Sequence, residues 1–172
     1  RVGTKVYFSL GNAIGIYDGT DWTSIALNAS IAGPFTNVNG VLFFAAYEGD
    51  HGRELWKSDG SSSGTLLVRD INPLSGSALP HDLTNVNGTL FFVASDGATG
   101  AELWKSDGTS SGTTLVSDIA SGATNSSPGQ LTNVNGTLYF TANNGSQGVE
   151  LWKSVGGAVS MLKDINPSGG SF

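Results

Sequence analysis

Apolar residues along the chain occur in short runs, separated by turns rich in glycine, asparagine and aspartate. In "TLFFVAS" (residues 89–95), Leu90 and Phe92 point to one face of an extended strand, while Phe91 and Val93 point to the other. Both faces are apolar, whereas a strand with one solvated face would alternate apolar and polar residues. "VLFFAA" and "TLYFTA" repeat the pattern elsewhere. The pattern predicts strands that are covered on both faces.

The residues around this run predict a four-stranded antiparallel meander. Asn87-Gly88 joins two apolar runs, and this dipeptide favours a two-residue type I′ hairpin because both positions need a positive φ. Two further Gly-rich turns follow it. The four predicted strands are residues 83–86, 89–95, 101–106 and 113–119.

Two phrases recur, and successive copies of each start 48 residues apart. "ELWKSDG" begins at Glu54 and Glu102, "ELWKSVG" begins at Glu150, and "NVNG" begins at Asn37, Asn85 and Asn133. Four strands in a unit of this length are typical of a β-propeller blade. A helical solenoid is excluded because the 3.6-residue period is missing, and a short-rung β-helix is excluded by the length of the repeat.

The expected fold is therefore all-β, a β-propeller built from four-stranded antiparallel blades of about 48 residues. Three full repeats cover residues 31–78, 79–126 and 127–172, and residues 1–30 form a degenerate fourth without the Glu-Leu-Trp. The degenerate repeat supplies "TKVYFSL", "AIGIYDG" and "TSIALNA" as its second, third and fourth strands. No linker divides the chain, so residues 1–172 form one domain. It is either four-bladed or part of a larger ring or assembly.

Composition narrows the function classes. Glycine accounts for 25 of the 172 residues, which suits tight turns, and the net charge of −6 argues against nucleic acid or an anionic membrane surface as a partner. The chain has no cysteine, so it has neither disulfides nor thiolate metal sites. Its longest apolar run, residues 41–47, is too short to cross a bilayer. The opening "RVGTKVYF" carries no signal-peptide pattern, so we expect a mature chain or an excerpt of a longer one.

The chain resembles the bacterial ELWxxDGT repeat family. "GAELWKSDGTSSGTTLVSDI" and "GRELWKSDGSSSGTLLVRDI" carry nearly the whole motif, and "GVELWKSVGGAVSMLKDI" carries its two ends. The resemblance covers residues 31–172 strongly and 1–30 weakly. It implies large, repetitive, secreted or surface-exposed bacterial proteins with propeller-like repeats. It implies no defined activity, and a shared fold would not establish one.

The tryptophans are candidate ligand residues, because some sugar-binding propellers present one aromatic per blade. Trp56, Trp104 and Trp152 lie mid-strand, where we expect each to pack on the next blade with its indole N–H bonded locally. Trp22 falls in a predicted loop and is the freer candidate.

The acidic residues of the repeat are expected to have structural roles. Glu102 and its equivalents lie three residues from a lysine, on the opposite strand face, so we expect backbone amides of a neighbouring blade as their partners. A catalytic pair would need carboxylates in unlike environments, and identical copies do not provide them. Asp59 and Asp107 sit in Gly-rich turns. Each is either a calcium ligand or, as we expect, an acceptor for its own turn.

The sequence thus predicts a non-catalytic, extracellular structural or adhesive module of a bacterial surface or secreted protein, with no metal and no cofactor. The alternative is a glycan-binding propeller. Under either interpretation, the expected partners of the protein are a glycan or protein ligand at the cell surface, and further copies of itself in a ring or filament. We also expect the segment near Phe172 to complete the blade begun by residues 4–9 in a four-bladed ring, because closing the ring protects strand edges. If the ring does not close within one chain, we expect a neighbouring copy to complete this blade, in a ring or a filament.

Overall fold

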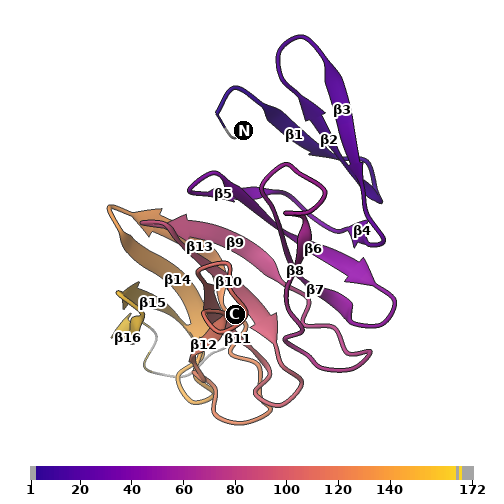
Figure 1. Cartoon of the computed structure of the whole chain (residues 1–172). Coiled ribbons are helices and arrows are strands. Elements are labelled where there is room, and N and C mark those ends of the chain that lie inside the picture. Colours follow the sequence, from indigo (N-terminus) through magenta and orange to yellow (C-terminus); the bar gives the residue numbers. More distant parts are fainter. Residues whose placement is uncertain (1–2, 166, 168–172) are drawn as a thin grey trace.

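The structure is a computed structural model, and it describes residues 3–165 and 167. The described residues form sixteen strands and no helix, and therefore no helix that could cross a membrane. All strands pair antiparallel, in four separate sheets (Figure 1). The all-β, repeated blade architecture expected from the sequence is confirmed.

Each sheet corresponds to one repeat. The first contains β1 (Val6–Ser9), β2 (Ala13–Tyr17) and β3 (Trp22–Ala26). The second contains β4 (Ser30–Ile31), β5 (Thr36–Val38), β6 (Val41–Glu48), β7 (Gly52–Ser58) and β8 (Leu66–Arg69), with β4 and β5 both paired to β6. The third contains β9 (His81–Val86), β10 (Thr89–Ser95), β11 (Ala101–Ser106) and β12 (Thr114–Ser117). The fourth contains β13 (Gly129–Val134), β14 (Thr137–Asn143), β15 (Val149–Val155) and β16 (Ala158–Lys163). We call these sheets blades 1 to 4.

The strands of blade 3 match the predicted ones closely. β10 and β11 have the predicted bounds, and the turn between β9 and β10 has φ of 50° at Asn87 and 83° at Gly88, as a type I′ turn requires. β9 begins two residues earlier than predicted. β12 (Thr114–Ser117) is shorter than the predicted 113–119, and beyond its end the Ile119 amide donates to the Glu102 carboxylate and not to a neighbouring strand.

The blades stack face to face, with one apolar core at each junction. Ile14, Ile16, Phe44 and Trp56 belong to the core between blades 1 and 2. The core between blades 2 and 3 contains Val38, Phe43, Leu55, Leu90, Phe92 and Trp104. The core between blades 3 and 4 contains Val86, Phe91, Leu103, Leu138, Phe140 and Trp152. Covering both faces of a blade is what the two-faced apolar strands require.

The first strands of blades 2 to 4 lie side by side, as the strands nearest the axis do in a propeller (Figure 1). Asn85 Nδ2 donates to the Asn37 carbonyl and Asn133 Nδ2 donates to the Asn85 carbonyl, both at 2.9 Å. The Oδ1 atom of each of these asparagines accepts the amide of its own turn, from Gly40, Gly88 or Gly136. The repeated "NVNG" therefore closes a hairpin and ties neighbouring blades together.

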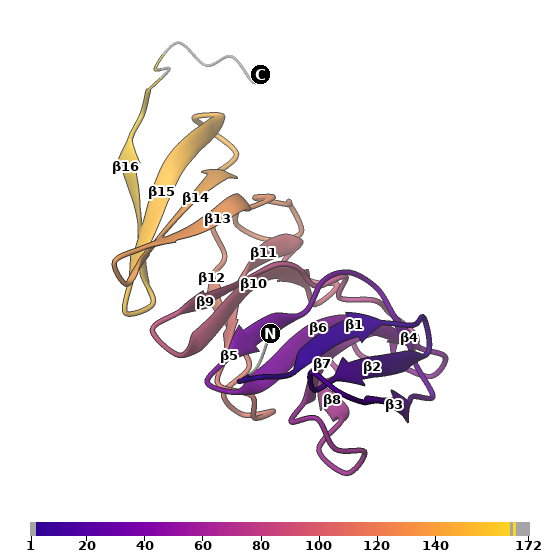
Figure 2. The same cartoon turned by 90° about the horizontal axis from the view of Figure 1, so that it is seen from above.

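Blades 1 and 4 lie at opposite ends of the row of sheets (Figure 2). The predicted contact between the segment near Phe172 and the first strand lies outside the described residues. In blade 1 the three predicted strands are present. Trp22, however, is the first residue of β3 rather than a loop residue, because its ring stacks on Tyr17 across the strand pair at a centroid distance of 4.4 Å.

Candidate functional site

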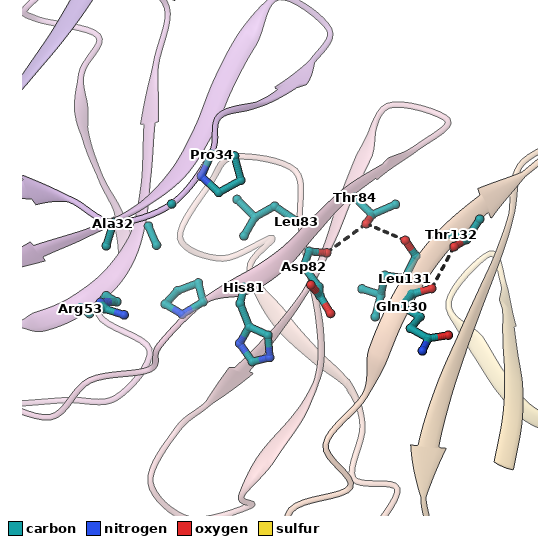
Figure 3. Close-up of a pocket in the computed structure, with 13 residues that line it drawn as sticks. Ala32, Pro34, Arg53, His81, Asp82, Leu83, Thr84, Gln130, Leu131 and Thr132 are labelled. Atoms are coloured by element: carbon teal, nitrogen blue, oxygen red, sulfur yellow. Dashed lines mark hydrogen bonds between the residues drawn. The ribbon is translucent and has the colours of Figure 1, made fainter. Parts of the chain in front are cut away.

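A pocket of about 690 Å³ lies at the start of the first strands. Blades 2, 3 and 4 all contribute to it, with side chains from β7, from β9 and its approach, and from β13 (Figure 3). We call it the axial pocket. Its lining residues are Ala32, Gly33, Pro34, Ala45, Arg53, Pro80, His81, Asp82, Leu83, Thr84, Gln130, Leu131 and Thr132.

Bulges in the first strands shape this pocket. The pairing of β9 with β10 slips between Phe91 and Val93, and that of β13 with β14 slips between Gly129 and Thr132. The extra residues include Asp82 and Gln130, whose φ angles of 53° and 56° are in the left-handed region. Bulges redirect side chains, and left-handed non-glycine residues gather at functional sites. The two bulges bring Asp82 and Gln130 into the pocket lining.

Blade 2 interrupts its strand at the same place. Pro34 occupies the repeat position of Asp82, and it has no backbone N–H to donate to the neighbouring strand. The strand is accordingly split into β4 and β5, with residues 32–35 between them. All three full repeats therefore depart from regular pairing where they line the pocket.

Threonine hydroxyls set the spacing of the blades below the pocket. Thr36 Oγ1 donates to the Leu83 carbonyl at 3.0 Å. Thr84 Oγ1 lies 3.0 Å from the Asp82 carbonyl and 3.3 Å from that of Leu131, so it is shared between its own strand and the next blade (Figure 3). These bonds hold the first strands of neighbouring blades together at the base of the pocket.

The exposed polar lining is chemically mixed. Arg53, His81, Asp82 and Gln130 are all exposed and provide a cation, an imidazole, a carboxylate and an amide. His81 Nδ1 lies 3.0 Å from the Leu79 carbonyl and must donate to it, because a carbonyl can only accept. Asp82 is the one carboxylate among the described lining residues, whereas glycoside hydrolysis uses a pair. Among the described residues, this lining therefore offers polar groups that could bind a ligand but not the carboxylate pair of a glycosidase.

The repeat tryptophans lie in the junction cores. Trp56 and Trp104 are 8% and 3% exposed, and Trp152 is half-buried. They pack on the preceding blade, not on the next one as predicted. The predicted local indole bond exists in Trp152, which donates to the Ala142 carbonyl at 3.0 Å. Among the described residues, the buried N–H groups of Trp56 and Trp104 have no partner.

Trp22 is placed differently from the other three. It is 64% exposed on the outer face of blade 1, and its ring also meets Phe8 edge-on at a centroid distance of 5.1 Å. It therefore belongs to an exposed aromatic cluster with Phe8 and Tyr17, and none of the three lines the axial pocket.

Asp59 and Asp107 close their own turns. Asp59 Oδ1 accepts the amide and the hydroxyl of Ser61, and Asp107 Oδ1 accepts those of Thr109, all at 2.7–2.8 Å. These bonds, led by the side-chain hydroxyls, lower the pKa of both carboxyls. In the described part of the chain, no group of three or more His, Cys, Asp or Glu side chains could hold a metal ion.

The repeat glutamates are buried and bind backbone amides, as expected, but of their own repeat and not of a neighbouring blade. Glu54 accepts from Ile71 at 2.9 Å and from Ala78 at 2.8 Å, and Glu102 accepts from Ile119 and Ser126 in the same way. The carboxylate thus braces the connection that leaves the blade. Desolvation outweighs the amide bonds in Glu54 and raises the pKa of its carboxyl to about 7.

Sequence reasoning identified none of the polar residues in the axial pocket. A signal was present in the differences between repeats. At the three positions equivalent to 81 the chain has Gly, His and Gly; at those equivalent to 82 it has Pro, Asp and Gln; and at those equivalent to 53 it has Arg, Ala and Val. By contrast, all three repeats have threonine at the equivalent positions 36, 84 and 132. Around the pocket, the repeat is thus constant at the threonines that join the blades and variable at the positions equivalent to 53, 81 and 82.

No protein-family model matches the chain, and no curated protein matches it either. The resemblance to the ELWxxDGT repeat family therefore stays a prediction from the residues.

Proposed function

We propose that this protein is a non-catalytic adhesive module of a secreted or surface-exposed protein, and that it contacts its ligand through the axial pocket. The observation that carries the proposal is the contrast between constant junctions and a variable lining. Residues that only build blades are free to be identical in every repeat. Residues that contact an asymmetric ligand have to differ, because each blade meets a different part of it.

A glycan is the ligand class that this lining favours. Sugars present hydroxyls to side chains such as Asp82, Gln130 and Arg53, and apolar ring faces to surfaces such as Pro34 and Leu83. A mixture of a mainly apolar wall with a few polar groups that fix orientation is the usual composition of a small-molecule site.

The test is a glycan array probed with the wild-type chain and with the double variant His81→Gly/Asp82→Gln. This variant gives blade 3 the pair that blade 4 already carries at 129 and 130, where Gln adopts the same left-handed φ. The fold should therefore be kept while the lining changes. We expect the double variant to bind the glycan at least about tenfold more weakly than the wild type, which corresponds to the loss of one polar contact of about 1.4 kcal/mol.

Ser62→Ala, in the outer turn of blade 2, is the matched control and should bind as the wild type does. A double variant that binds glycans as well as the wild type would exclude the axial pocket as the site. A wild-type chain that binds no glycan but adheres to cells through a surface protein would keep the adhesive role and remove the glycan.

A further inference from the structure

Blade 4 has an uncovered face whose equivalents are buried in blades 2 and 3. We call the side of each blade that meets the next one its following face. Val134 on this face of blade 4 is 48% exposed, whereas Val38 and Val86 at the same repeat position are each 6% exposed. Leu151 is 37% exposed, and its equivalents in blades 2 and 3 are fully buried. Leu162 and Val155 are also exposed apolar residues of this blade.

The following face also carries polar groups that bond across the other junctions. Lys57 Nζ donates to the Gly108 carbonyl of the next blade at 2.7 Å. Lys153 is the copy of Lys57 in blade 4, and Thr132 is the copy of Thr36, which bonds to the next blade's Leu83. Blade 4 thus carries both the apolar and the polar parts of a junction, and no described residue covers them.

The outer face of blade 1 is the matching end. Its inner face packs on blade 2 through Ile14 and Ile16, while the opposite face exposes Val6 (41%) and Trp22 (64%) beside Phe8. Uncovered apolar patches of this kind mark interaction surfaces.

A turn glycine completes the match. At the two junctions where the Asp-Gly turn is present, between blades 1 and 2 and between blades 2 and 3, its glycine lies against an aromatic side chain of the preceding blade. A Cβ atom on Gly60 would lie 2.8 Å from the Tyr7 hydroxyl, and one on Gly108 would lie 3.1 Å from the Phe43 ring. Gly19 is the equivalent glycine of blade 1, and nothing lies within 4 Å of its Cβ position. Tyr139 is the corresponding aromatic on the following face of blade 4.

We propose that the following face of blade 4 binds the outer face of blade 1 in a second copy of this chain, head to tail. The contact continues the three junctions already present. Blade 4 supplies the residue types of those junctions at the same repeat positions, whereas blade 1 supplies Val6, Phe8 and Trp22 in place of the Glu-Leu-Trp. Blade 1 of the same copy does not cover this face, because the two blades lie at opposite ends of the row (Figure 2). Two copies joined at both ends make a ring of eight blades, and a rotation that does not close makes a filament.

The first experiment is size-exclusion chromatography with light scattering on the purified chain at micromolar concentration. We expect a dimer, twice the 17.6 kDa of one chain, or a larger head-to-tail polymer. Leu151→Lys should give a monomer with an unchanged melting temperature, because Leu151 is partly exposed in the single chain. Leu74→Lys, at a loop residue that is 82% exposed, is the matched control and should associate as the wild type does. A monomeric wild type, or a Leu151→Lys variant that still associates, overturns the proposal.

The second experiment tests the head-to-tail arrangement. Leu151→Lys damages only the following face of blade 4, and Trp22→Lys damages only the outer face of blade 1. Each variant alone should be monomeric, while their mixture should form a one-to-one complex through the two intact faces. A symmetric contact between like faces could not give this result, so a mixture that stays monomeric overturns the proposal.

Discussion

Glu54 shows how one residue of the repeated phrase anchors the connection that leads from its blade to the next. Its carboxyl group is fully buried and accepts the amides of Ile71 and Ala78, which begin and end the connection to blade 3. An unmade bond to either amide would leave a buried donor unsatisfied, at a cost of about 1–3 kcal/mol. The glutamate of "ELWKSDG" is therefore a structural brace.

The burial of Glu54 makes the stability of the protein depend on pH. The pKa of its carboxyl is about 7 in the folded chain and near 4.5 when unfolded, so folding favours the protonated form. The resulting stability is complete below pH 4.5 and is lost as pH rises to about 7, by up to ~3 kcal/mol at 1.36 kcal/mol for each pKa unit.

Urea unfolding between pH 4 and 8 measures this effect. We expect the free energy of unfolding to decrease across that window in the wild type and to change much less in Glu54→Gln, which cannot ionise. A free energy that rises with pH in the same window would contradict the assignment.

At the scale of the element, the Asp-Gly turn after the third strand joins two blades. Asp107 closes the turn from within, and Gly108 receives both the Phe43 ring and the Lys57 ammonium of the preceding blade. Gly108 has a φ of 88°, which disfavours any side chain, and the ring leaves little room for one. The "DG" of the motif thus serves the turn and the junction together.

Gly108→Ala should destabilise the protein for both reasons, and Gly122→Ala for one. Gly122 has a φ of 83° but no atom within 4 Å of its Cβ position, so its substitution should cost only the backbone term of about 1–2 kcal/mol. We expect a larger loss of unfolding free energy for Gly108→Ala. Equal losses in chemical denaturation would show that the contact with Phe43 contributes nothing.

The elements were predictable where local chemistry decides them. β10 and β11 have the predicted bounds because Asn-Gly turns and two-faced apolar runs define them locally. The direction in which Trp104 packs was not predictable, since a strand that is apolar on both faces reads the same toward either neighbour. The bulge at Asp82 was missed because its sequence carries no glycine, and the pocket arises only where two such bulges meet the interrupted strand of blade 2.

At the scale of the whole molecule, the number of covered faces differs between blades. Blade 3 is packed on both sides, and the five central residues of β10 are all buried. In β14 only alternate residues are buried, because the following face of blade 4 is open. Repeat proteins gain much of their stability from contacts between neighbouring units, so the blades should differ in local stability.

Amide hydrogen exchange on the monomeric Leu151→Lys variant should reveal this gradient. We expect the amides of β14 and β15 to exchange through a local opening, well before those of β10 and β11, which should require global unfolding. A uniform exchange free energy across blades 3 and 4 would mean that the uncovered face does not lower the local stability of blade 4.

The separation between constant junctions and a variable pocket also bears on how such a chain diversifies. The junctions between blades 2 and 3 and between blades 3 and 4 use the same partners at a fixed offset of 48 residues, as Asn85 to Asn37 and Asn133 to Asn85 show. A blade duplicated or recombined in frame at "NVNG" meets its new neighbours with bonds it already makes. Only the residues at the bulge, such as the His81-Asp82 pair, arrive changed. Exchanging a whole blade thus changes the pocket-lining residues in one step, while the bonds between blades, and with them the fold, are kept.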